Sequence, residues 1–124
     1  MAETKELDAA RERFAEHVRA KYAALAGERP SSTKANRQVA ATDSLVQEWD
    51  ERGIVKDVLV PLLDDQDPAL RCSAASYLLY HGESERAQEV LTALADEDDL
   101  GAVASLADTA LLVWEDRHDD GRTS

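Results

Sequence analysis

The chain has 124 residues, which is enough for one hydrophobic core and too short for two domains. Its hydrophobic residues (44%) and charged residues (32%) are in the range of a soluble globular protein, and no apolar run is long enough to span a membrane. The formal net charge of −12 lies almost wholly in residues 63–124, where fifteen acids face four Lys or Arg, and such a surface repels nucleic acid.

Three helices are predicted in the first half of the chain. The first extends over about residues 3–26, where apolar side chains recur at steps of three or four, and a glycine ends it. The second extends over about residues 33–52, with Gly53 at the position that favours a left-handed cap. A short third helix covers about residues 54–63, and its Pro61 should kink it or confine it to two turns.

Three more helices are predicted in the second half, at about residues 68–82, 84–95 and 99–118, and no run alternates with the period of a strand. Pro68 suits the first helical position, because its missing N–H would be unpaired there anyway. Short polar side chains precede each apolar stretch and are the predicted N-caps: Asp67, Ser84, and Asp98 or Asp99. Residues 119–124 are predicted to be a flexible C-terminal tail.

Residues 54–82 resemble residues 86–114 when the chain is compared with itself at a shift of 32. Eight of 29 positions are identical without a gap, and the acidic corner at residues 64–67 aligns with the acidic corner at residues 96–99. A helical hairpin repeated at a fixed period is typical of a solenoid. The prediction is therefore an all-α protein, a right-handed HEAT/armadillo-like α-solenoid of about three hairpins and six helices, with residues 1–118 in a single domain.

The stretch "LLDDQDPALRCSAASYLL", residues 62–79, resembles the HEAT repeat. The second helix of that repeat typically opens with Asp and Pro, then a small or apolar residue, then Arg; here these are Asp67, Pro68, Leu70 and Arg71. Together with "STKANRQ" and a late "TALLVWE", roughly residues 10–116 also resemble a family of small bacterial proteins, the domain of unknown function numbered twenty-nineteen. That resemblance implies an all-helical repeat fold, and it brings no established activity and no catalytic residues.

No cluster of residues in the sequence is typical of a catalytic, cofactor or metal site. The histidines have no partner at zinc-ligand spacing, and "DDQD" lacks the central Gly and the distant Glu of a calcium loop. There is also no Gly-rich phosphate loop. Residues 1–20 contain five acids and no apolar segment of a signal peptide, and the single Cys72 cannot form an internal disulfide. We therefore expect a cytoplasmic protein in which Cys72 is a small buried hydrophobe.

The acidic corners before the fourth and sixth helices are predicted to form one surface. Alternate corners of an antiparallel helix stack lie on the same edge, and these two are one repeat apart. Part of the charge is structural, because Asp67 and Asp98 or Asp99 are expected to cap helices. The remaining carboxylates form the predicted acidic rim, which should bind Lys or Arg of a protein partner: Asp64, Asp65, Asp96 and Glu97.

Three aromatic residues are predicted to lie in the core or at an interface: Trp49, Tyr77 and Trp114. Trp49 and Trp114 are near the ends of the second and sixth helices, so both should lie at the end opposite the acidic corners. We expect both rings to be buried between adjacent helices, and an anchor for a partner is the alternative.

Taken together, these features favour a protein-binding module that is not an enzyme and needs no cofactor. A basic protein partner is expected, as for a bacterial immunity or antitoxin-like protein that blocks a basic toxin through the acidic rim. The alternatives are a structural or regulatory subunit that self-associates through apolar surface left open at the end of the stack, and, third, an uncharacterised enzyme. The chain is expected to be a monomer or a weak homo-oligomer that binds neither nucleic acid nor a membrane.

Overall fold

The computed structural model describes residues 4–26, 29 and 31–122, and the side chains of all of these except 98 and 118–122. This part of the chain is all-helical and has no strand, as the sequence predicted. Its elements are α1 (Thr4–Leu25), α2 (Ser32–Arg52), α3 (Val55–Leu59), the 3₁₀-helix η1 (Val60–Asp64), α4 (Pro68–Leu78), α5 (Ser84–Ala95), the 3₁₀-helix η2 (Asp98–Leu100) and α6 (Ala102–Arg122).

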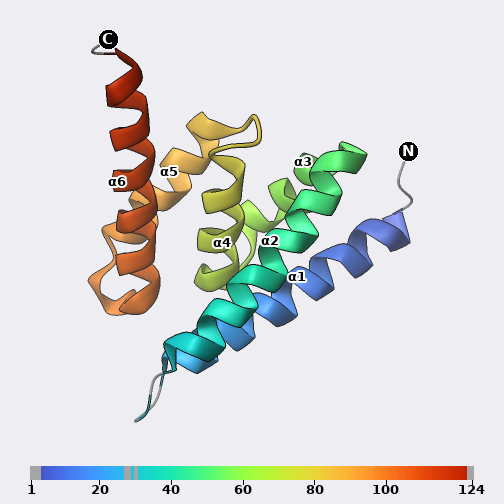
Figure 1. Cartoon of the computed structure of the whole chain (residues 1–124). Helices are drawn as coiled ribbons and strands as arrows, with labels where there is room; N and C mark the ends of the chain where they lie inside the picture. The colour runs from blue at the N-terminus through green and yellow to red at the C-terminus, as the bar shows by residue number, and fades with distance from the viewer. Residues whose placement is uncertain (1–3, 27–28, 30, 123–124) are drawn as a thin grey trace.

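The helices pack around α4, which lies in the middle of the molecule (Figure 1). α1 and α2 form an antiparallel pair on one side of α4, and α5 and α6 lie on its other side. α4 contacts helices on both sides, and its Ala74 and Ala75 are completely buried. Small side chains on a central helix allow neighbours to approach closely from two directions. The sequence of α4 is apolar on two faces, which suits a helix that lies between neighbours.

One hydrophobic core runs through the molecule and takes side chains from every α-helix. The largest side chains that are fully buried come from α1, α3, α4 and α5: Phe14, Val18, Val58, Leu59, Leu70, Cys72, Leu78 and Leu91. On α2, Val46 and Trp49 are buried, and the polar Thr42 on the same face is buried too. The Thr42 hydroxyl donates to the Gln38 carbonyl at 2.7 Å, which satisfies it inside the core.

The ends of α2 and the start of α4 follow from local sequence. Ser31 caps α2 by accepting from the Lys34 N–H, and Gly53 ends it in the left-handed region at φ 70°. Asp67 caps α4 by accepting from the Ala69 N–H, and Pro68 takes the first helical position. The predicted cap Asp67 is therefore confirmed.

Four boundaries in the second half differ from the prediction. α4 ends at Leu78 rather than near residue 82. Ser84 is the first residue of α5 rather than its cap, and Glu83 at the cap position makes no side-chain capping bond. α6 begins at Ala102, because the η2 turn and Gly101, at φ 59°, intervene after the acidic corner. Asp99 therefore lies in η2 and is not the N-cap of α6, and the Asp98 side chain is outside the described part. At its other end α6 continues to Arg122, four residues into the stretch predicted as a tail.

Pro61 divides the third helix. α3 has a single turn and a half, and the chain tightens into η1 at Val60. In an α-helix the N–H of residue 61 would donate to the Asp57 carbonyl, and in a 3₁₀-helix it would donate to the Val58 carbonyl. Proline has no N–H, so Pro61 supplies neither bond. The corresponding residues of α5 stay α-helical to Ala95, so the two repeat units share the order of their helices but not their local structure.

None of the helices in the described residues has the length and apolar character needed to cross a membrane.

Candidate functional site

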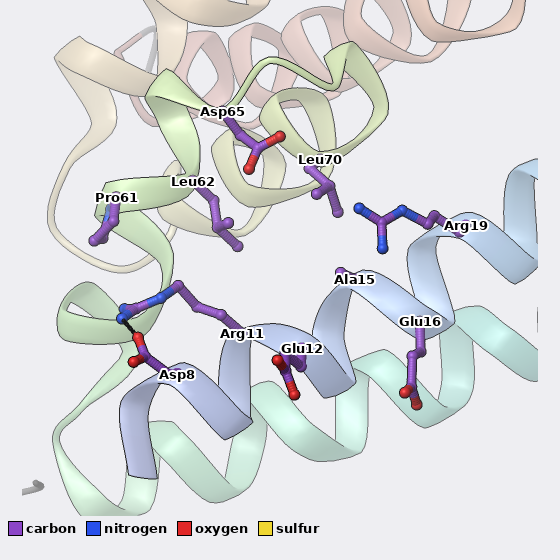
Figure 2. A pocket seen from close by; sticks show the side chains of 10 residues that line it. All are labelled: Asp8, Arg11, Glu12, Ala15, Glu16, Arg19, Pro61, Leu62, Asp65 and Leu70. Carbon is purple, nitrogen blue, oxygen red and sulfur yellow. Dashed lines mark hydrogen bonds and ion pairs between the residues drawn. The ribbon is translucent and has the colours of Figure 1, made fainter. Parts of the chain in front are cut away.

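A groove of about 700 Å³ lies between α1 and the corner that joins η1 to α4 (Figure 2). One wall is formed by α1 and the other by Pro61, Leu62, Asp65 and Leu70. In Figure 2, Leu70 and Ala15 face each other across the groove, and Arg19 extends from α1 towards Leu70. The floor is thus apolar, and charged side chains surround it.

Most of the charge in the groove is negative. α1 contributes Asp8, Glu12 and Glu16, which are four residues apart and therefore share one helix face. The corner contributes Asp65, whose Oδ1 accepts from the Asp67 N–H at 2.8 Å. Four acids thus line the groove together with only two arginines, Arg11 and Arg19.

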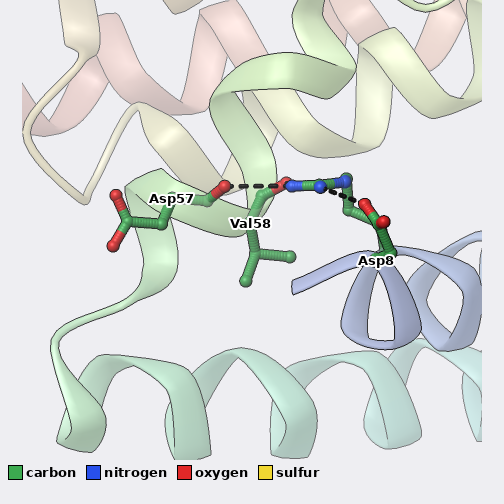
Figure 3. Close-up of polar contacts among 4 residues, drawn as sticks. Asp8, Asp57 and Val58 are labelled. Carbon is green, nitrogen blue, oxygen red and sulfur yellow. Dashed lines mark hydrogen bonds and ion pairs between the residues drawn. The ribbon is translucent and has the colours of Figure 1, made fainter. Parts of the chain in front are cut away.

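Both arginines of the groove are engaged within the chain. Arg11 Nη1 donates to the Asp57 carbonyl at 3.1 Å and lies 3.5 Å from the Val58 carbonyl, the two groups drawn in Figure 3. These are the carbonyls to which residue 61 would donate if it had an N–H, so Arg11 supplies a donor from another helix. Arg11 Nη2 also pairs with Asp8 at 2.6 Å.

Arg19 lies at the other end of the groove, where its Nε is 3.7 Å from the capping carboxylate of Asp67. In contrast to the arginines, Glu12 and Glu16 are exposed and make no ion pair or hydrogen bond with any described residue. The groove therefore has an excess of negative charge that the described chain does not neutralise.

The four residues of the predicted acidic rim have different surroundings, and their joint role in binding stays a prediction. Asp65 faces α1 in the groove, while Asp64 pairs with Arg86 at 3.3 Å, on the first turn of α5. Asp96 is the C-cap of that same helix, about 15 Å further along its axis at 1.5 Å per residue. Glu97 lines a hollow of about 240 Å³ between α5 and the η1–α4 segment, together with Leu63 and Arg71.

Two acids of the first corner are partly neutralised within the chain, because Arg86 pairs with Asp64 and Arg19 lies near Asp67. Sequence reasoning missed Asp8, Glu12 and Glu16 as partners of Asp65. Their spacing of four residues on a predicted helix was the signal that could have found them.

The three candidate aromatic residues have different environments. Trp49 is 3% exposed and its ring packs on Phe14, with centroids 6.1 Å apart, so its burial is confirmed. Tyr77 is partly buried, packs edge-on against Phe14 and donates its hydroxyl to Asp43 on α2. Trp114 is only partly buried, and it packs edge-on against the exposed ring of Tyr80 at 5.2 Å. The expectation that Trp114 is buried between helices is thus only partly met.

A second polar cluster lies where α1 meets α4, around Cys72. Cys72 is 2% exposed, which confirms it as a buried hydrophobe, and burial raises the pKa of its thiol. The hydroxyl of Tyr22 is buried beside Cys72 and Ser73 without a well-formed hydrogen bond, and burial also raises its pKa. Burial lowers the pKa of the neighbouring Lys21 ammonium. Desolvation thus favours the neutral form of each of these side chains, and none of them lines the groove.

This cluster predicts a loss of stability at alkaline pH. Burial raises the pKa of Tyr22, and burial together with the Asp43 hydrogen bond raises the pKa of Tyr77. Above about pH 10 the unfolded chain ionises its tyrosines while the folded chain keeps these two protonated, so the free energy of unfolding falls as pH rises. Lys21, with its lowered pKa, acts in the opposite sense, and only up to about pH 10.5.

Tyr22→Phe removes one of these groups and should make the fall shallower by about 1 kcal/mol per pH unit above pH 10. Urea unfolding at several pH values from 8 to 11 measures this slope. Tyr80→Phe is the control, because Tyr80 is exposed. Equal slopes for wild type and Tyr22→Phe would contradict the prediction.

Among the described residues, no group of three or more His, Cys, Asp and Glu side chains is arranged to hold a metal ion. The imidazole of His17 is hydrogen-bonded to Gln38 at 2.8 Å and that of His81 lies 3.3 Å from Asp50, whereas the His118 side chain is outside the described part. Comparison of the chain with protein-family models, with curated proteins and with solved structures found no match. The resemblance to the HEAT repeat and to the bacterial family therefore stays a prediction.

Proposed function

We propose that this chain is a non-enzymatic protein-binding module that holds Lys or Arg side chains of a basic protein in the groove beside α1. The observation that carries the proposal is the excess of carboxylates in that groove, with Glu12 and Glu16 free of partners among the described residues. Acids four residues apart on a helix repel one another, at a cost of about 0.2–0.5 kcal/mol per pair. Cations of a partner placed between them would remove that cost and add charge-assisted hydrogen bonds.

The overall negative charge of the chain also favours a basic protein partner. A net charge of −12 on a chain of 124 residues produces a field that attracts a basic protein and speeds its association. An immunity or antitoxin-like protein, which covers the basic active site of a toxin, needs these properties and no catalytic group. We place such a protein in the cytoplasm and assign it a short HEAT-like α-solenoid, on the support of the repeat at a shift of 32.

The proposal is tested with a groove variant that combines Glu12→Gln, Glu16→Gln and Asp65→Asn. The matched control combines Glu48→Gln, Glu51→Gln and Glu85→Gln, which changes the net charge equally at exposed acids outside the groove. The probe is the basic product of a neighbouring gene, purified and titrated by calorimetry at low and high salt. We expect the groove variant to bind at least tenfold more weakly, about 1.4 kcal/mol, and the control to lose less than half of that.

Two results would contradict this function. Equal losses in the groove variant and the control would mean that only the overall charge attracts the partner. Unchanged affinity in the groove variant, with a salt dependence like that of the wild type, would remove the groove from the binding surface.

A further inference from the structure

The outer face of α6 exposes apolar side chains. Leu112 is 58% exposed and Val113 is 44% exposed, the two largest apolar exposures on this helix. The opposite face of α6 packs on α5 and α4. α6 is the last helix in the described part of the chain, and Figure 1 shows no described element on its outer side. An apolar surface at the end of a helical array is unusual, because end units normally present polar faces to solvent.

The internal repeat indicates what such a position contacts. At the shift of 32, Tyr80 corresponds to Leu112. The ring of Tyr80 packs on the Trp114 ring at 5.2 Å, and the Arg117 guanidinium lies 5.5 Å from the centroid of the same ring. In the first unit this position therefore contacts α6, the second helix of the next unit. In the second unit the same position, Leu112, has no further unit to contact among the described residues.

The charge around Leu112 is negative, whereas Arg117 lies one turn after Val113. Asp108 and Asp116 lie one turn before and one turn after Leu112, and Glu115 lies three residues after it. All three side chains are exposed and make no ion pair with any described residue. The surface thus has an apolar centre and carboxylates around it, and an occupant must match both.

We propose that the outer face of α6 binds a basic amphipathic helix of a partner protein, which continues the helical array. Its apolar side chains would contact Leu112 and Val113, as Trp114 of α6 contacts Tyr80, and its Lys or Arg side chains would pair with Asp108, Glu115 and Asp116. A second copy of this chain fits less well, because a two-fold interface brings the same acidic patch from both subunits together. The inference uses none of the groove residues, so it stands independently of the proposed function.

The probe is a fluorescein-labelled peptide of about five helical turns, made of Leu and Lys with the Leu residues on one face. Binding is followed by fluorescence anisotropy at low salt. We expect the variant Leu112→Gln with Val113→Gln to bind at least tenfold more weakly than the wild type, since it removes the apolar centre and retains every charge. The groove variant should change the affinity less than twofold. A peptide of the same composition without the apolar face should bind at least tenfold more weakly.

Three results would overturn the inference. A loss of binding in the groove variant, with none in the Leu112 and Val113 variant, would assign the peptide to the groove. Equal affinity for the two peptides would mean that charge alone drives the binding. Sedimentation of a homodimer that the Leu112 and Val113 variant dissociates would identify a second copy as the occupant. Circular dichroism of each variant establishes that the fold is retained, which is expected because both substituted side chains are exposed.

Discussion

Replacing Phe14 with alanine is expected to lower the free energy of unfolding by about 3–5 kcal/mol. The Phe14 ring is 0% exposed and lies where α1, α2 and α4 meet. It contacts the Trp49 ring at 6.1 Å and the Tyr77 ring at 6.0 Å, both in tilted or edge-on geometry. Truncation therefore removes the buried area of the ring and its aromatic contacts, and it leaves a cavity between three helices that cannot easily close.

Urea unfolding monitored by circular dichroism measures this loss. Leu112→Ala is the matched control, because Leu112 is 58% exposed and its truncation should change the free energy of unfolding by no more than about 0.5 kcal/mol. Phe14→Leu should have an intermediate cost, since it fills most of the volume but removes the aromatic contacts. A loss below about 1.5 kcal/mol for Phe14→Ala would mean that the three helices rearrange to fill the space.

Replacing Arg11 with alanine is expected to cost about 1.5–3 kcal/mol, the range for hydrogen bonds made by charged groups. Arg11 donates to the carbonyls of Asp57 and Val58, which are 46 and 47 residues away along the chain. A helical residue 61 would donate to one of these carbonyls, but Pro61 has no N–H. Without Arg11 these carbonyls would have to find water at the junction between α1 and η1.

Pro61→Ala restores an N–H at the position where both carbonyls could use it, so its effect should depend on Arg11. In the wild type we expect Pro61→Ala to cost about 0.5–1 kcal/mol, because the unfolded chain becomes more flexible. In the Arg11→Ala background the new N–H should offset part of the damage, and the two substitutions should be coupled by about 1 kcal/mol.

A double-mutant cycle in urea measures this coupling. Asp8→Asn tests the other contact of Arg11, and we expect it to cost no more than about 0.5 kcal/mol, since the Asp8 side chain is 62% exposed. Additive effects of Arg11→Ala and Pro61→Ala would show that the guanidinium does not substitute for the missing N–H.

Local interactions decide the features that the sequence predicted. The 3.6-residue period of α1, α2, α5 and α6 comes from backbone geometry that each helix has by itself. The ends at Gly53 and Asp67 come from a left-handed glycine and from a carboxylate close to a free N–H, both within a few residues. The break at Pro61 likewise depends only on the missing donor. The capping rule did not hold at Ser84. α5 starts at Ser84 itself, one residue earlier than predicted, and has no side-chain cap.

Tertiary packing alone decided which charges and which apolar faces meet. Asp64 and Asp65 are neighbours in sequence, yet one pairs with Arg86 on α5 and the other lines the groove beside α1. The helical period places Leu112 and Val113 outside the inward stripe of α6, but it cannot tell whether another helix covers them. Periodicity reports the faces of one helix, whereas contacts between helices depend on crossing angles and on the shape of every side chain between them. The sequence therefore determined an all-helical chain with an acidic second half, and only the packing of α1 against the η1–α4 corner created the acidic groove.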